Sequence, residues 1–458
     1  LSNNKRNILI LLICIVFSFA THAGNIVNGY FVTDDFTVIN LNHSESFSKA
    51  VITPYGNDHI FPLFRTELKV LDTAFGENPI PFNLFVFALF ALTPFFVYFT
   101  FRRLDLGILP FLLFLTIYSG ATSWADLLTG YYAMSLYVQI LFFFSVAVWS
   151  YTAWNQSGEK RHLFFLGIAT ALALAVDIPG IWIIPSLFFL MLALEWTPNK
   201  DGVRGIVPFL KAQRAPIITV MSIGIIFVAF WVFSFTALQP GTFLSTLNAE
   251  GNGTSLSSTE VASKRAEEWR LLPLAKNFVS FFSSGVALPV VAPSVVKILT
   301  HPALAHRFDS VWTVLEWLVF ILNIWFFWFV FKRSPSKERR LILWFLISMI
   351  ITIVMIILAR PNHNPIPDFD YRYAGAPFFF YTFFLAVAAS LLLRTKKEQS
   401  VKIVLSLIIV SLAAQQIFSF HALRLKIEAQ QRTAGVTEFK NSLLAELATL
   451  KTVDKNSP

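Results

Sequence analysis

Two adjacent carboxylates, Asp34 and Asp35, lie in the stretch GYFVTDDFTVIN, about a dozen residues after a very hydrophobic segment. The same predicted loop continues with YGNDHIFPLFRTE, which contains Asp58, His59 and Arg65. Carboxylates, an imidazole and a guanidinium in one loop can bind a phosphate group or a metal ion and can act in general acid–base catalysis. The alternative for the acidic pair is a solvated surface pair or a helix N-cap.

Two further segments contribute side chains of the same kinds. The stretch SWADLLTGYY contains Asp126, for which a plain surface role is the alternative. The stretch RPNHNPIPDFDYRYAGA, residues 360–376, contains a group of cationic and aromatic side chains: Arg360, Tyr371, Arg372 and Tyr373. All these segments are polar stretches between long hydrophobic runs, so the hydrophobic runs must position them.

The composition indicates a polytopic membrane protein. The chain has 458 residues, of which 55% are hydrophobic and only 14% are charged, whereas about 25% are charged in ordinary globular proteins. Charged residues are costly in a lipid bilayer, which explains the deficit. The single cysteine, Cys14, rules out a disulfide within the chain. The net charge of +9 does not indicate a nucleic-acid partner, because the basic residues map onto one side of the predicted membrane.

The hydrophobic runs predict an all-α fold with about 11 transmembrane helices, since a helix needs about 20 apolar residues to cross a bilayer. The fifth and sixth runs are short and are separated only by DIPG, which predicts a turn inside the membrane or at its edge. The predicted spans are 7–23, 83–101, 104–120, 131–153, 163–177, 180–196, 215–237, 311–331, 341–359, 377–393 and 402–419.

The distribution of basic residues predicts a cytoplasmic N-terminus. With this orientation, 19 of the 36 lysines and arginines fall in short cytoplasmic segments, and 11 fall outside, six of them in one long loop. Basic residues in short loops favour the cytoplasmic side, whereas long translocated loops carry little weight. A cleaved signal peptide is the alternative for the first hydrophobic run, but a retained helix makes the remaining topology consistent.

This topology defines one transmembrane domain, 1–419, with outer loops at 24–82, 238–310 and 360–376. The C-terminal tail, 420–458, is predicted to be extracytoplasmic. In the long loop, a helix beginning near Thr259 is expected to lie at the membrane interface or to pack, solvated, on the outer face. His301 and His306 are read as loop residues.

The order of the motifs resembles the first outer loop of GT-C-fold glycosyltransferases, which use polyprenyl-phosphate sugars. The order is an apolar helix, the pair Asp34-Asp35, then GNDHIFPLFR, then FGENPIPFNL, then a second apolar helix. HIFPLFR and FGENPIPFNL fall where that family has interfacial helices and the entry to its second span. YRYAGAPFFFY, 371–381, is similar to the Arg-Tyr…Pro signature that many of these enzymes carry before a late helix.

The resemblance implies roles for the candidate residues. Asp34 or Asp35 is the expected general base, which activates an acceptor hydroxyl and gives inversion at the anomeric carbon. A guanidinium is expected to stabilise the departing lipid phosphate, with Arg372 as the first candidate and Arg360 as the reserve. The remaining donor-phosphate candidates are Tyr373 and Arg65, and the substrate-binding candidates are Asp58, His59, Asp126 and Tyr371. A divalent cation such as Mg²⁺ or Mn²⁺ is optional, with Asp35 and His59 as its ligands.

The implied partners are a polyprenyl-phosphate sugar donor and an acceptor that is a surface glycan, a lipid-linked saccharide or a protein. The expected location is a bacterial inner membrane with the active site on its periplasmic face, and a eukaryotic endomembrane is the alternative. Three alternatives stay open: a flippase or transporter of lipid-linked saccharides, a polysaccharide polymerase or ligase, and a non-catalytic scaffold of the same fold. A transporter is expected to have polar residues in many spans, and a polymerase needs no acidic pair behind the first helix.

Overall fold

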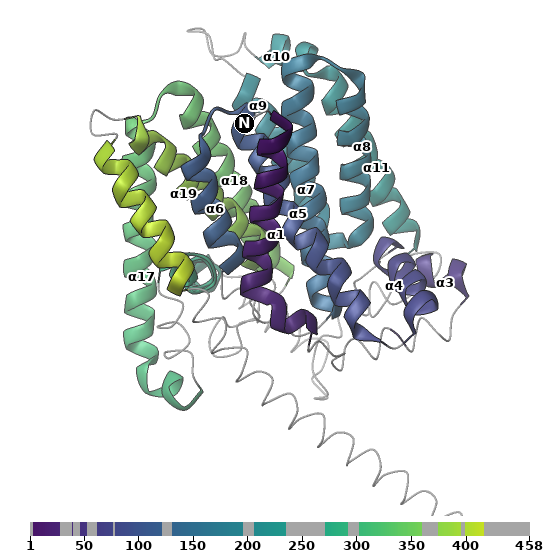
Figure 1. The fold of residues 1–458 in the computed structure, drawn as a ribbon, viewed down its shortest axis with the longest axis horizontal. Helices are drawn as coiled ribbons and strands as arrows, with labels where there is room; N and C mark the ends of the chain where they lie inside the picture. Colours follow the sequence, from purple (N-terminus) through teal and green to yellow (C-terminus); the bar gives the residue numbers. More distant parts are fainter. Residues whose placement is uncertain are drawn as a thin grey trace, which may run out of the picture.

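The computed structural model describes residues 3–27, 39, 46–52, 62–76, 78–120, 131–195, 206–234, 271–291, 302–359, 374–394 and 399–415. Within these ranges the chain is helical and contains no β-strand. Figure 1 shows most of the long helices standing side by side as a bundle. An all-α arrangement satisfies every backbone hydrogen bond within each helix, as the hydrocarbon core of a membrane requires.

The helices follow the hydrophobic runs of the sequence. The first part of the chain forms α1 (Asn3–Val27), α3 (Phe47–Ile52), α4 (Pro62–Phe75), α5 (Pro79–Arg103), α6 (Ile108–Gly120), α7 (Tyr131–Ser157) and α8 (Lys160–Val176). The middle part forms η3 (Ile178–Trp182), α9 (Ile183–Glu195), α10 (Ile206–Ala212), α11 (Arg214–Phe233), α14 (Leu271–Ser280), the π-helix η5 (Phe281–Ala287) and α15 (Leu288–Val291). The last part forms α17 (Pro302–Arg333), α18 (Ser336–Ala359), α19 (Gly375–Leu393) and the helix Gln399–Gln415.

Seven of the described helices are long and apolar enough to cross a membrane, so the chain is a multi-pass membrane protein. They are α1, α5, α7, α11, α17, α18 and α19. Three shorter apolar helices accompany them, at Ile108–Gly120, Gly180–Glu195 and Gln399–Gln415. Each predicted span overlaps a described helix, including the short fifth span on α8, while the count of eleven spans stays a prediction.

Two turns show how the sequence begins and ends its helices. Asn78 caps α5, where its side-chain oxygen accepts a hydrogen bond of 3.1 Å from the Ile80 N–H, and Pro79 follows at the first helical position, a position that needs no N–H donor. DIPG forms the predicted turn between α8 and α9 through η3. A Cβ on Gly180 would lie 2.8 Å from the Ala173 carbonyl oxygen, which explains why glycine occupies this turn.

α19 lies at the centre of the bundle. It contacts α6, α7, α18 and η5, and nearly all of its residues from Gly375 to Ser390 are buried. Phe383 packs against Phe101, Phe114 and Phe345, with ring centroids 5.0–5.1 Å apart. Aromatic pairs of this geometry stabilise a core beyond the burial of their surface. The many phenylalanines of the sequence thus join the early and late helices into one core.

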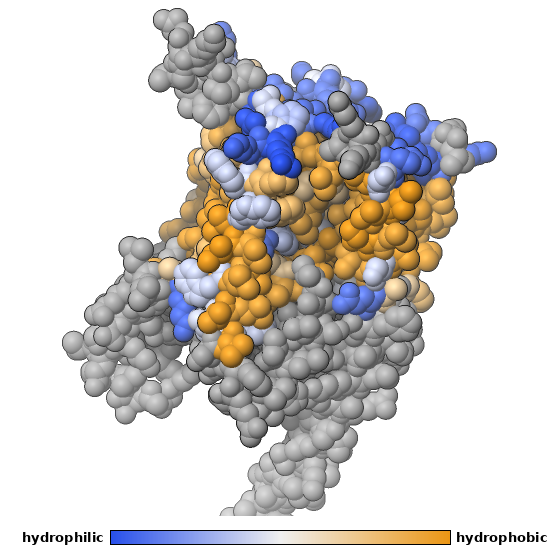
Figure 2. Space-filling view, turned by 90° about the vertical axis from the view of Figure 1, so that its left-hand side faces the viewer, coloured by the Kyte–Doolittle hydropathy of each residue, from blue (hydrophilic) through white to orange (hydrophobic). Residues whose placement is uncertain are grey.

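A series of hydrogen bonds brings seven helix ends together at one end of the bundle, which we call the basic end. Arg102 at the end of α5 donates to Asn3 of α1, and Arg340 of α18 donates to the carbonyl oxygen of Ala193 in α9. The other links are Arg103–Gln156, Asn155–Glu195, Gln213–Asn155, Arg394–Glu338 and Arg394 to the Asp105 carbonyl oxygen. In Figure 1 this end lies at the top, beside the N-terminus, and Figure 2 shows hydrophilic residues along it above a broad hydrophobic band.

The long predicted outer loop contains more helix than expected. α17 begins at Pro302, nine residues before the predicted span, so His306 lies in a helix and not in a loop. The 21 residues Leu271–Val291 form α14, η5 and α15, which pack against α17, α18 and α19. All seven residues of η5 are buried, so this segment is built into the bundle. The predicted start of its helix near Thr259 and the tail 420–458 lie outside the described residues.

Candidate functional site

The segments that carry the predicted site residues attach to helix ends on one side. The basic end holds the start of α1, the end of α7, the start of α18 and the end of α19. The opposite ends of these helices, at Val27, Tyr131, Ala359 and Gly375, therefore lie together at the far end of the bundle. The segments 28–38, 121–130 and 360–373 are connected directly to those ends.

Most of the predicted site residues lie outside the described residues. They are Asp34, Asp35, Asp58, His59, Asp126, Arg360, Tyr371, Arg372 and Tyr373. Their proposed roles, including metal binding by Asp35 and His59, stay predictions. Among the residues that the structure describes, no group of three histidine, cysteine, aspartate or glutamate side chains is arranged to hold a metal ion.

Arg65 is the predicted site residue that the structure does describe, and it lies on the buried face of α4. The helix begins at Pro62 and buries Phe64, Arg65 and Leu68, a spacing that places them along one side. It ends at Gly76, which has a φ of +60° and donates its N–H to the Asp72 carbonyl oxygen at 2.8 Å, a conformation that glycine adopts without strain. HIFPLFR was expected to form an interfacial helix of the first outer loop. Its residues from Pro62 onward do begin a helix, α4, while the interfacial position stays a prediction.

The burial of Arg65 is nearly complete, since only 1% of the residue is exposed. α4 packs against α3, α5 and α8, and Arg65 is buried within this packing. A cationic guanidinium in such a position is stable only with hydrogen-bond acceptors or negative charge around it. Arg65 therefore places a cationic side chain on the buried face of α4.

A carboxylate two residues further along α4 ties this helix to α7. Ser135 donates to Oε1 of Glu67 at 3.3 Å, and the Gln139 side-chain amide donates to Oε2. Ser135 and Gln139 are four residues apart, on one face of α7. Glu67 was not among the predicted site residues, although a glutamate on an amphipathic helix beside Arg65 is a signal that the sequence contains. The contact fixes α4 over the Tyr131 end of α7.

α1 is held in the bundle by buried polar contacts with α6. The ring nitrogen Nε2 of His22 lies 2.7 Å from the Ser119 carbonyl oxygen, and Oγ of Ser18 lies 3.4 Å from Oγ of Ser119. The His22 ring also meets Phe90 of α5 edge-on, with centroids 4.9 Å apart. These contacts fix the helix end from which the Asp34–Asp35 segment continues, while retention of the first helix stays a prediction.

A fully buried carboxylate belongs to Asp177, the residue that caps the C-terminal end of α8. Asp177 is 2% exposed, and its backbone is extended between α8 and η3. α8 begins with Lys160 at the basic end, which also holds Gln156 of α7. Asp177, just after the other end of α8, therefore lies at the far end of the bundle, where α4 packs on α8. An acid this deeply buried beside a predicted span is a candidate functional residue.

The sequence did not predict the polar cluster around Glu316. Glu316, 4% exposed on α17, accepts hydrogen bonds at Oε1 from Ser280 at 2.6 Å and from Ser284 at 2.5 Å. Its backbone oxygen accepts a third, from Ser283 at 2.7 Å. The signals were a single acid in the apolar run VWTVLEWLVFIL and the serines of FVSFFSSGVA. Acids within membrane spans and π-helices both mark functional positions frequently.

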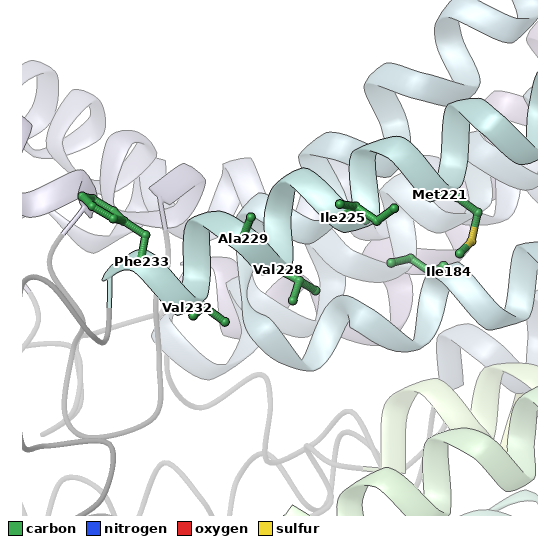
Figure 3. A pocket seen from close by; sticks show the side chains of 8 residues that line it. Ile184, Met221, Ile225, Val228, Ala229, Val232 and Phe233 are labelled. Carbon is green, nitrogen blue, oxygen red and sulfur yellow. The ribbon is translucent and has the colours of Figure 1, made fainter.

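The groove in Figure 3 differs from these clusters in carrying no polar chemistry. It has a volume of about 630 Å³ and lies between Ile184 of α9 and seven residues of α11. Its lining is entirely apolar: Ile184, Met221, Gly224, Ile225, Val228, Ala229, Val232 and Phe233. A groove of this kind suits the apolar part of a membrane and offers no group for catalysis.

The electrostatic arrangement therefore separates two ends of the bundle. One end gathers most of the described basic residues, and the other carries Arg65, Glu67, Asp177 and the attachment points of every segment predicted to act in catalysis. No protein-family model matches the sequence, and no curated protein is significantly similar to it.

Proposed function

We propose that the chain is an integral-membrane glycosyltransferase of GT-C-like architecture with eleven membrane-spanning helices. It transfers a sugar from a polyprenyl-phosphate donor to a surface glycan, a lipid-linked saccharide or a protein. The observation that carries the proposal is the common sidedness of the segments that contain Asp34, Asp35, Asp126 and Arg372, all of which attach to helix ends opposite the basic end. Positive charge favours the cytoplasmic side, which makes the opposite end extracytoplasmic.

The proposed reaction is a single displacement. The acceptor hydroxyl oxygen attacks the anomeric carbon, the bond from that carbon to the phosphate oxygen breaks, and polyprenyl phosphate leaves with the bonding electrons. Asp34 or Asp35 takes the hydroxyl proton as the new bond forms. Arg372, or Arg360 in its place, stabilises the negative charge that grows on the phosphate.

The neighbourhood of α4 supports this assignment. Buried Arg65 supplies positive charge on the helix that follows the acidic pair in the sequence, and Glu67 fixes α4 on α7. Asp58, His59, Asp126 and Tyr371 contact the substrates in this proposal, and Tyr373 assists Arg372. A bacterial inner membrane is the proposed location, because lipid-linked donors suit a protein with little mass outside the bilayer.

A flippase of lipid-linked saccharides is the second candidate, and the cluster at Glu316 favours it. An acid that accepts bonds from two serine side chains within a predicted span is a feature that transporters use. A flippase binds the same donor without breaking its sugar–phosphate bond, so the two candidates differ in the products they release.

The test is release of polyprenyl phosphate by the purified chain in proteoliposomes, offered a panel of polyprenyl-phosphate sugars with cell-envelope glycans as acceptors. We expect release by the wild type and a fall of at least about a hundredfold in the Asp34→Asn/Asp35→Asn variant. Equal release by both proteins would remove the acidic pair from the site. Movement of the donor across the bilayer without release would establish the flippase instead.

A further inference from the structure

The corner between α17 and α18 is the most strongly charged surface of the described chain. Residues 332–340 read KRSPSKERR and contain five basic side chains and one acid. The basic residues are Lys332, Arg333, Lys337 and Arg339, which are exposed, and Arg340, which is partly buried. The acid is Glu338, which is buried and forms an ion pair with Arg394 of α19. The exposed surface of the corner is therefore cationic.

Contacts of the three arginine side chains of the corner hold them in fixed positions. Arg339 donates from Nη2 to the Lys332 carbonyl oxygen at 2.9 Å, across the turn between the two helices. Arg340 donates from Nε to the Ala193 carbonyl oxygen at 2.8 Å. The Arg333 guanidinium carbon lies 3.8 Å from the centroid of the Phe329 ring. Side chains that are already ordered lose less conformational entropy when a ligand binds.

The charge of the corner continues directly into an apolar aromatic surface. Trp325, Phe329 and Arg333 are each four residues apart on α17, so they follow one face of the helix. The rings of Trp325 and Phe329 are stacked with centroids 5.4 Å apart, and Arg333 covers Phe329. Trp325 is 60% exposed and Trp328 is 61% exposed, so both offer their surface to lipid.

We propose that this corner binds an anionic phospholipid, with the phosphate headgroup on Lys332, Arg333 and Lys337 and an acyl chain along Trp325 and Trp328. A lipid fits because it presents a negative phosphate beside an apolar chain, and the corner presents cations beside the exposed aromatic rings of α17. A free anion would use only the cations. The inference is independent of the proposed transferase activity, because it concerns the end of the bundle opposite the candidate site.

The test is native mass spectrometry of the full chain released from detergent, with phosphatidylglycerol or phosphatidylcholine added at equal concentrations. We expect the wild type to retain phosphatidylglycerol at least about tenfold more than phosphatidylcholine. The variant Lys332→Ala/Arg333→Ala/Lys337→Ala should lose this preference. The matched control, Lys160→Ala/Arg161→Ala/Lys211→Ala, removes the same charge from other helices of the same end and should keep it.

Two further arms identify the ligand and guard against a misfolded variant. Inorganic phosphate at the lipid's concentration should leave bound phosphatidylglycerol in place, and displacement would overturn the lipid assignment. If the triple variant is not monodisperse, Arg333→Gln replaces it under the same criterion. Retained preference in the corner variant, or equal loss in the corner and control variants, would overturn the proposal.

Discussion

Glu67 and Glu316 each join a segment outside the predicted spans to a predicted span. Glu67 lies on the outside segment, whereas Glu316 lies on the span. Glu67 belongs to α4, and its partners Ser135 and Gln139 belong to α7. Glu316 belongs to α17, and its partners are serines of α14 and η5. Glu67 is only partly buried, whereas Glu316 is almost completely buried.

The difference in burial indicates different tasks. A buried carboxylate that loses its partners, or leaves them without an acceptor, costs much more stability than a partly hydrated one. The Glu316 cluster is therefore expected to act mainly on stability, by holding Leu271–Val291 in the bundle. The Glu67 contact is expected to act mainly on function, because α4 follows the segment that carries Asp34 and Asp35.

The largest expected effect on stability is that of Glu316→Leu. The substitution leaves the hydroxyls of Ser280 and Ser284 without their buried acceptor, so we expect the free energy of unfolding to fall by about 3 kcal/mol. Unfolding in mixed detergent micelles measures this change. Glu316→Gln is the control, since it keeps an acceptor oxygen and should lose less than half as much. Equal losses in the two variants would show that the hydrogen bonds are not the cause.

A smaller loss of stability is expected for Glu67→Ala. Because Glu67 is partly hydrated, removal of its bonds to Ser135 and Gln139 should lower the free energy of unfolding by about 1 kcal/mol. The sugar-transfer rate should fall more than this stability change explains, because α4 loses its position over α7. A double-mutant cycle with Gln139→Ala tests the contact. Strict additivity of the two single effects would contradict a direct interaction.

The sequence predicted the helices well because their signal is local. A run of about 20 apolar residues is sufficient to identify a span, and each predicted run falls on a helix. A helix at HIFPLFR was expected only through the resemblance of the motif order to a known family, and α4 begins at its proline, Pro62. The sequence also placed Arg102, Arg340 and Arg394 on one side of the predicted membrane, and the structure has all three at the basic end.

The sequence did not predict the packing of Leu271–Val291, because its signal is not local. Ser280 and Glu316 are 36 residues apart, and nothing in either stretch names the other as its partner. Apolar residues among basic ones in this stretch led to the expectation of an interfacial helix, whereas the burial of η5 depends on α17 and α19. The burial of Arg65 was missed for the same reason, since it depends on how α4 packs against α8.

The measurement that tests the account most directly is the rate of polyprenyl-phosphate release by Asp34→Asn and Asp35→Asn, each made alone, beside the wild type and Glu316→Gln. The account predicts that at least one aspartate variant loses about a hundredfold or more in rate, while Glu316→Gln stays within a few-fold of the wild type. Wild-type rates in both aspartate variants would contradict a catalytic role for the acidic pair.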